Sequence, residues 1–191
     1  MKKHIILCGR RQVGKTTMIN RLMRELRVPV YGYQTSTTVR DPDGTRHIYM
    51  YPAGKVNGYM SGENHVGDCN MKVRSVNRSV FEDLGVRLLK GAKPDGVIVM
   101  DEIGFMEIGA DDFCGEVLRA LDGDIPVLAA VKDTEFGSEF LDKIRKHQNA
   151  GVYMLTEKNR DEVFAAVCPV VLGWNSIGQY PKQIDETDHI T

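Results

Sequence analysis

Residues 9–16 read Gly-Arg-Arg-Gln-Val-Gly-Lys-Thr. Two glycines are separated by four residues, and the second glycine is followed by a lysine and then by a residue with a hydroxyl group. A loop bounded by glycines can turn its backbone N–H groups toward phosphate oxygens, and a helix beginning at the second glycine adds its positive dipole end. The lysine ammonium suits the β- and γ-phosphates, and the threonine hydroxyl suits Mg²⁺. The pattern predicts a phosphate-binding loop whose contact residues are Gly9, Arg10, Arg11, Gln12, Val13, Gly14, Lys15, Thr16 and Thr17. For Arg10 and Arg11 the alternative is a solvated charge near the anion site.

A second candidate lies where the apolar run of residues 97–100 ends in two carboxylates, Asp101 and Glu102. In a nucleotide-binding α/β protein, Asp101 is placed to hold Mg²⁺ together with Thr16. Glu102 is then placed to orient a water molecule that attacks the γ-phosphate. An acidic pair after a buried strand is common in turns, so the phosphate loop upstream is what favours this interpretation. The two motifs together predict hydrolysis of a nucleoside triphosphate.

Four further residues are candidates at this site, and three of them have a second interpretation. Arg40 either offsets charge developing on the γ-phosphate, which makes it a catalytic candidate, or is a solvated hairpin residue. Asn159 and Arg160 follow the last predicted strand, at the sheet edge where α/β proteins bind ligands, so they are candidates to border the base. Asn159 is equally suited to cap the helix that follows. Lys132 ends another strand at this edge and is either a phosphate contact or a surface lysine.

Short apolar runs and helical patterns alternate along the chain. The runs are bounded by glycine, proline or charge and predict strands buried on both faces over His4–Cys8, Gly96–Met100, Pro126–Val131 and Val152–Leu155. The helical patterns cover Lys15–Leu26, Ser79–Lys90, Asp111–Leu121, Ser138–His147 and Asn159–Ala166. This alternation predicts an α/β fold of the P-loop type, with three layers and a mainly parallel central sheet.

The stretch from Val30 to about Asn77 departs from this alternation, because it is extended and rich in turn residues. Asp43-Gly44 separates two β-prone runs and predicts a hairpin, so we expect a small antiparallel excursion from the main sheet. We predict one domain over residues 1–173 with this insertion at about 30–77. Residues 174–191 are predicted to form a polar tail, ordered only if Trp174 or Tyr180 docks.

Composition narrows the classes of partner. The 191-residue chain carries 25 basic and 26 acidic side chains, a net charge of -1 that gives no general attraction to nucleic acid or anionic membranes. No apolar stretch approaches the length of a bilayer span. The four scattered cysteines form no CxxC pair, which predicts reduced thiols in a cytoplasmic protein and argues against a zinc site. The oligomeric state, the preferred base and the physiological substrate are left open.

Two longer segments resemble a known family. Residues 99–107, Val-Met-Asp-Glu-Ile-Gly-Phe-Met-Glu, resemble the DEIGxME signature of small P-loop nucleoside-triphosphatases. That family was characterised in thermophiles and includes the human cancer-related nucleoside-triphosphatase. Residues 155–162 are similar to its late LTxxNRDE stretch, and the resemblance covers most of the chain in order. It implies Mg²⁺-dependent hydrolysis of nucleoside triphosphates to diphosphate and phosphate, with broad base tolerance.

The resemblance also implies roles for single residues. Asp101 matches the family's metal ligand, Glu102 its water-activating residue and Glu107 its second glutamate, which either acts at the site or braces a loop. Phosphate and metal binding carry over to Gly14, Lys15, Thr16 and Thr17. The stretch 32–40 departs from the family's GFxTxEVR-like pattern, because its acidic residue is absent. This departure puts the rate of turnover in doubt.

Two other functions fit the same motifs. A phosphotransferase would use the excursion as an acceptor site and would close over the phosphates with arginines such as Arg74, Arg78 and Arg87. A nucleotide-gated regulator would bind the triphosphate, hydrolyse it slowly and present a changed surface to another protein or RNA. The missing acidic residue in the 32–40 stretch favours the regulator slightly.

Overall fold

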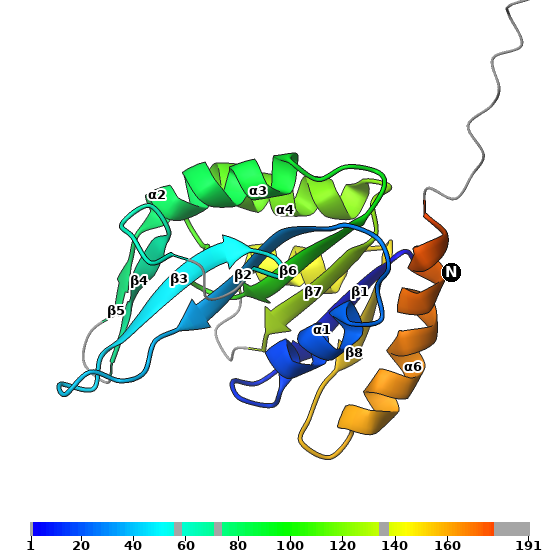
Figure 1. The fold of residues 1–191 in the computed structure, drawn as a ribbon, viewed down its shortest axis with the longest axis horizontal. Coiled ribbons are helices and arrows are strands. Elements are labelled where there is room, and N and C mark those ends of the chain that lie inside the picture. The colour runs from blue at the N-terminus through cyan, green and yellow to red at the C-terminus, as the bar shows by residue number, and fades with distance from the viewer. Residues whose placement is uncertain (1, 56–58, 71–73, 134–137, 178–191) are drawn as a thin grey trace, which may run out of the picture.

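A single central sheet organises residues 2–55, 59–70, 74–133 and 138–177, which are the residues that this computed structural model describes (Figure 1). Within them the strand order is β5-β4-β3-β2-β6-β7-β1-β8. The strands are β1 (His4–Gly9), β2 (Val30–Thr37), β3 (Arg46–Pro52), β4 (His65–Cys69), β5 (Arg74–Val76), β6 (Val97–Ile103), β7 (Val127–Lys132) and β8 (Ala150–Met154).

The sheet has a parallel part and an antiparallel part that meet at β2. Strands β2, β6, β7, β1 and β8 pair in parallel, whereas β3, β4 and β5 follow β2 in antiparallel pairs. The predicted hairpin is present, since Gly44 N donates to Asp41 O and Asp41 N to Thr45 O between β2 and β3. The predicted fold class, mainly parallel with a small antiparallel excursion, is therefore confirmed, and β2 itself belongs to the parallel part.

Helices cover both faces of the sheet, which gives three layers (Figure 1). They are α1 (Lys15–Met23), α2 (Arg78–Val80), α3 (Val86–Lys90), α4 (Asp111–Asp122), α5 (Glu139–Arg145) and α6 (Arg160–Gly173), with a π-helical turn over Phe81–Gly85 joining α2 to α3. The parallel strands alternate their apolar side chains between two cores. Ile6 and Cys8 of β1 pack with α3, α4 and α5, whereas Ile5 and Leu7 pack with α1 and α6.

Three elements differ in extent from the sequence prediction. Strand β6 continues to Ile103, so Asp101 and Glu102 lie within the strand rather than in a turn after it. Helix α1 ends at Met23, and α6 continues through Pro169 to Gly173 because Val167 and Val171 are buried on one face. A 3₁₀ turn over Trp174–Ser176 follows, and Trp174 docks at 8% exposure. Tyr180 and the rest of the predicted tail lie outside the described residues.

Two compositional expectations also have structural counterparts. All four cysteines are free thiols, with Cys8 buried and the other three partly exposed. Among the helices that the structure describes, none combines the length and apolar character needed to cross a membrane.

Candidate nucleotide-binding site

The phosphate loop connects the end of β1 to the start of α1. Gly14 adopts a left-handed backbone conformation with φ 101°, which residues with a side chain rarely adopt. This conformation lets the chain turn directly into the helix. Lys15 is 3% exposed, and its Nζ donates to the carbonyl oxygens of Gly9 and Arg10 at 2.8 Å each. The buried ammonium is thus held against the loop at the N-terminus of α1, where a helix attracts anions.

Asp101 lies beside Thr16 at the carboxyl end of the parallel strands. Thr16 Oγ1 donates to Asp101 Oδ1 at 3.1 Å, and Gln34 Nε2 lies 3.4 Å from Asp101 Oδ2. Burial raises the pKa of Asp101 to about 6, against the lowering effect of these two hydrogen bonds. A hydroxyl and a poorly solvated carboxylate are hard oxygen donors, which is the ligand chemistry that Mg²⁺ requires. The two residues present therefore fit the metal that the sequence implies.

Glu102 lies beside Lys15 and is more exposed to solvent than the neighbouring Asp101. Its Oε2 lies 3.1 Å from Lys15 Nζ, and its side chain keeps 29% of its exposure, in contrast to the buried Asp101. A register shift between Asp101 and Ile103 interrupts the pairing of β6 with β7 at this point. Four predicted site residues, Lys15, Thr16, Asp101 and Glu102, are thus joined by direct contacts although 85 residues separate Thr16 from Asp101.

A cavity of about 380 Å³ opens beside Glu102 and Thr16. The phosphate loop contributes Arg11 and Gln12 to its lining, and strand β3 contributes Ile48. The wall therefore combines the edge of the parallel part that carries Thr16 and Glu102 with side chains of the antiparallel part. Arg11 is one predicted loop residue whose charge faces this space, whereas Arg10 contacts Lys15 through its carbonyl oxygen.

Arg160 and Asn159 are both close to the phosphate loop but have different contacts. Arg160 Nε donates to Val13 O at 2.8 Å and lies against Gly14, where a β-carbon would come within 3.2 Å of it. Asn159 Oδ1 accepts from Thr156 N at 2.8 Å and Nδ2 donates to Met154 O at 2.8 Å. Arg160 thus joins the predicted site, whereas Asn159 holds the turn between β8 and α6 without a side-chain cap.

Two other candidates have structural contacts of their own. Arg40 lies in the exposed loop between β2 and β3, where its Nη1 is 3.4 Å from Gly44 O, and it does not line the cavity. Thr17 is exposed in the first turn of α1. The structure therefore does not bring Arg40 to the residues around Lys15, and a catalytic role for it stays a prediction.

Glu107 is almost completely buried, at 3% exposure, and its Oε2 accepts from Gly104 N at 2.9 Å. Burial raises the pKa of this carboxyl to about 7, against the lowering effect of that hydrogen bond. Lys132 shares the same part of the cavity, with its Nζ 4.6 Å from the centre of the Phe105 ring. The contact with Gly104 means that Glu107 braces the loop after β6 beside the cavity.

Comparison with known proteins identifies the family. The family model described as NTPase matches residues 4–168. The chain belongs to this NTPase family. It is 31% identical over 173 residues to the nucleoside-triphosphatase THEP1 of Thermofilum pendens, with 83% of this chain and 90% of that protein covered.

Two solved structures share the fold of this NTPase. The crystal structure of THEP1 from Aquifex aeolicus superposes with a TM-score of 0.68 at 24% identity, covering 88% of this chain and 98% of the other. The solution structure of a human cancer-related nucleoside triphosphatase gives a TM-score of 0.64 at 25% identity, covering 90% and 98%. The resemblance to this family that the sequence indicated is therefore confirmed.

Sequence reasoning missed two residues that hold Asp101 in this NTPase. Gln34 is 1% exposed and also donates to Asn20 Oδ1 at 2.9 Å, while Thr35 Oγ1 donates to Asp101 O at 3.2 Å. Gln34 faces Asp101 in the parallel register of β2 with β6. The available signal was the glutamine itself within a predicted extended stretch, because a glutamine that becomes buried needs polar partners.

Proposed function

We propose that this NTPase hydrolyses nucleoside triphosphates to nucleoside diphosphate and phosphate with Mg²⁺. The observation that carries the proposal is the contact between Lys15 and Glu102, 3.1 Å apart, directly beside the Thr16–Asp101 hydrogen bond. A phosphate-binding cation, a pair of metal-binding oxygens and a partly exposed carboxylate thus occupy one edge of the sheet. The names of the relatives, nucleoside-triphosphatases, agree with this chemistry.

Each residue has a distinct part in the proposed reaction. The backbone N–H groups of the phosphate loop and the Lys15 ammonium bind the β- and γ-phosphate oxygens. Thr16 and Asp101 would hold Mg²⁺, which neutralises phosphate charge when bound. Glu102 accepts a hydrogen bond from a water molecule and orients it toward the γ-phosphorus. As the water oxygen bonds to phosphorus, the bond to the β–γ bridging oxygen breaks, releasing nucleoside diphosphate and inorganic phosphate.

The cellular setting that we propose is the cytoplasm. The four free thiols agree with a reducing compartment, because glutathione and thioredoxin keep cytoplasmic thiols reduced. Fractionation of cells expressing a tagged form of the chain tests this: recovery with periplasmic or membrane fractions contradicts it.

The function is tested by phosphate release from ATP, GTP and CTP with Mg²⁺ and no acceptor. Glu102→Gln should lower the turnover rate by about 100-fold or more because the amide is a poor base, while leaving nucleotide affinity nearly unchanged. The exposed Glu63 provides a matched control, and Glu63→Gln should retain full activity. Full phosphate release by Glu102→Gln contradicts the assignment. Tight binding without turnover by the native protein supports a nucleotide-gated regulator instead.

A phosphotransferase is the second candidate, and the 380 Å³ cavity beside Glu102 is the observation that favours it. An acceptor alcohol in this space would lie next to the triphosphate. The arginines expected to close over the phosphates give less support: Arg78 Nε donates to Ile108 O at 3.2 Å, and Arg87 is exposed on α3. The side chain of Arg74 lies outside the described part of the structure. Transfer of labelled γ-phosphate to an added nucleoside or small alcohol, in place of phosphate release, identifies a phosphotransferase.

A further inference from the structure

Two histidines and an aspartate converge on the antiparallel part of the sheet. His47 Nδ1 lies 2.6 Å from Asp68 Oδ1, and His65 Nε2 lies 2.8 Å from the same oxygen. The three potential ligand atoms all lie within 4.8 Å of one another. The side chains of His47, His65 and Asp68 are about one-third exposed, at 32%, 29% and 32%. The cluster is therefore open to an ion from solvent without being a mobile surface group.

A β-bulge creates this convergence. His47 faces Asp68 in the antiparallel register, but the register shifts before Tyr49, which faces His65. In a regular strand residues 65 and 68 would point to opposite faces, because side chains alternate. One extra residue in β4 restores them to the same face as His47, which is how bulges redirect side chains. Gly67 lies beside the extra residue with φ 152°, and a β-carbon there would lie 2.1 Å from Ser75 O, so glycine is what lets β5 pair this closely with the bulged strand.

The cluster has supporting hydrogen bonds of the kind found around bound metals. Asp41 Oδ2 lies 3.0 Å from Nε2 of His47, on the far side of the ring from Asp68. Ser75 Oγ donates to Asp68 Oδ2 at 3.1 Å, which leaves Oδ1 facing the histidines. A carboxylate behind a ligating histidine fixes its ring, and hydrogen-bonded ligand carboxylates are equally typical of metal centres.

We propose that His47 Nδ1, His65 Nε2 and Asp68 Oδ1 bind a divalent zinc-type ion, with water as the fourth ligand. Two imidazoles and one carboxylate suit Zn²⁺ rather than Mg²⁺ or Ca²⁺, which prefer oxygen ligands. Zinc bonds of about 2.0–2.1 Å place tetrahedral ligand atoms roughly 3.3 Å apart. The two histidine nitrogens, now 2.6 and 2.8 Å from Asp68 Oδ1, must therefore move away from that oxygen by roughly 0.5–0.7 Å when the ion enters. All three side chains are partly exposed. The absence of a CxxC pair excludes only thiolate zinc sites.

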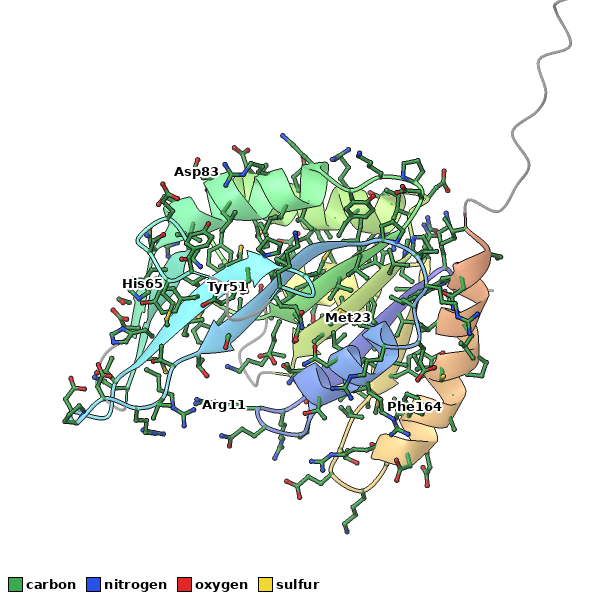
Figure 2. All side chains as sticks on the ribbon, viewed as in Figure 1. Arg11, Met23, Tyr51, His65, Asp83 and Phe164 are labelled. Carbon is green, nitrogen blue, oxygen red and sulfur yellow. The ribbon has the colours of Figure 1, made fainter. Side chains whose placement is uncertain are left out.

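The zinc cluster, defined as His47, His65 and Asp68, shares no residue with the contacts around Lys15, but it borders the same cavity. Asp68 and its partner Ser75 line the cavity that opens beside Glu102, whereas His47 and His65 do not. Figure 2 shows His65 on the antiparallel part, apart from Arg11 of the phosphate loop. With its supporting residues, the cluster joins the β2–β3 loop to β3, β4 and β5. The bound ion would therefore stiffen the part of the cavity wall that Asp68 and Ser75 form.

The test is titration of the full chain with Zn²⁺ by calorimetry in the presence of millimolar Mg²⁺. We expect one high-affinity equivalent, a rise in melting temperature with zinc, and a tetrahedral absorption spectrum with Co²⁺. His65→Ala and Asp68→Asn should each weaken zinc binding by at least about 10-fold and remove the rise in melting temperature. His147 is the matched control, because it also faces an aspartate, Asp122 at 3.1 Å, but belongs to no described ligand cluster.

Three results overturn the proposal. The first is unchanged zinc affinity in both His65→Ala and Asp68→Asn, and the second is a Co²⁺ spectrum dominated by thiolate charge transfer, which would place the ion on cysteines. The third is loss of zinc binding in Asp101→Asn, which would place the ion at the nucleotide site. Circular dichroism of the metal-free variants checks that they are folded, so that loss of binding reports the ligands rather than the fold.

Discussion

The two parts of the sheet bring polar side chains together in different ways. In the parallel part, Lys15, Thr16 and Asp101 come from a helix start and a strand end, which the fold places at one edge. In the antiparallel part, His47, His65 and Asp68 meet because one extra residue in β4 changes the direction of its side chains. The first arrangement follows from local sequence, whereas the second depends on a single irregularity of pairing.

This difference predicts how each part responds to change. The nucleotide site should tolerate damage to the bulge, because its residues are held by β1, β6 and α1. The zinc cluster should not tolerate it, because no other feature aligns residues 65 and 68. Gln34 lies where the two parts meet: its Oε1 accepts from Gly54 N at 3.0 Å and its Nε2 faces Asp101.

The largest effect is expected for Gly67→Ala. Gly67 has φ 152°, and a β-carbon would lie 2.1 Å from the carbonyl oxygen of Ser75, so β4 and β5 must separate. We expect a loss of about 4 kcal/mol in the free energy of unfolding, together with loss of zinc binding. Gly44→Ala is the control: φ is 84° but no atom lies within 4 Å, so the cost should be about 1 kcal/mol. Urea denaturation measures both.

The Gly67→Ala variant also tests the independence of the two parts. Nucleotide affinity should change by less than about threefold when measured at a temperature where the variant is folded. Equal loss of nucleotide and zinc binding would show that the antiparallel part is required to form the phosphate site.

Gln34→Leu should have the next largest effect, because it acts at the junction. The substitution removes the hydrogen bonds that the buried Gln34 makes with Asn20, Gly54 and Asp101, so we expect a loss of roughly 3 kcal/mol in the free energy of unfolding. Phosphate release should fall as well, since Asp101 loses one of its two side-chain donors. Gln148→Leu, on an exposed residue, should change stability by less than about 0.5 kcal/mol. If Gln34→Leu is as stable as the native protein, the hydrogen bonds of Gln34 contribute nothing to the free energy of unfolding.

Glu107→Gln should have the smallest effect and should depend on pH. The pKa of Glu107 is raised from 4.5 to about 7, so the folded protein binds a proton that the unfolded chain has lost between these values. This contribution to stability is full below pH 4.5 and is lost as pH rises through 7. Glutamine is neutral throughout, so the variant should nearly match the native protein at pH 4.5 and exceed its stability by about 2 kcal/mol at pH 6. A pH-independent difference in thermal or urea unfolding contradicts this ionisation.

Much of the fold could be predicted because it rests on repeating local patterns. The apolar runs ending at Cys8 and Met100 alternate with helical patterns, and this alternation requires a parallel sheet with helices on both faces. The hairpin at Asp43-Gly44 could also be predicted, because this turn dipeptide separates two β-prone runs. The contacts of Lys15, Thr16, Asp101 and Glu102 also follow, because a phosphate loop and an acidic strand end have a fixed relation in such a sheet.

The remaining features arise from pairings that no local pattern encodes. Gln34 could not be linked to Asp101 without the register of β2 with β6. His65 and Asp68, three residues apart, read as opposite faces of a strand until the bulge is known. Arg160, at the start of α6, donates a hydrogen bond to Val13 of the phosphate loop. Arg40 instead contacts Gly44 within its own hairpin loop. Both residues follow predicted strands, so the sequence alone could not tell which of them reaches the site.

The docking of Trp174 gives the molecule a built-in optical probe. It is the only tryptophan in the chain and packs in the core shared by α1 and α6, and the neighbouring Asn175 hydrogen-bonds Glu25 O and Arg27 N after α1. Its fluorescence should therefore respond to rearrangement of the helix that begins at the phosphate loop. Zinc binding on the antiparallel part of the sheet should leave the Trp174 emission unchanged. Tryptophan fluorescence should therefore distinguish nucleotide binding from zinc binding.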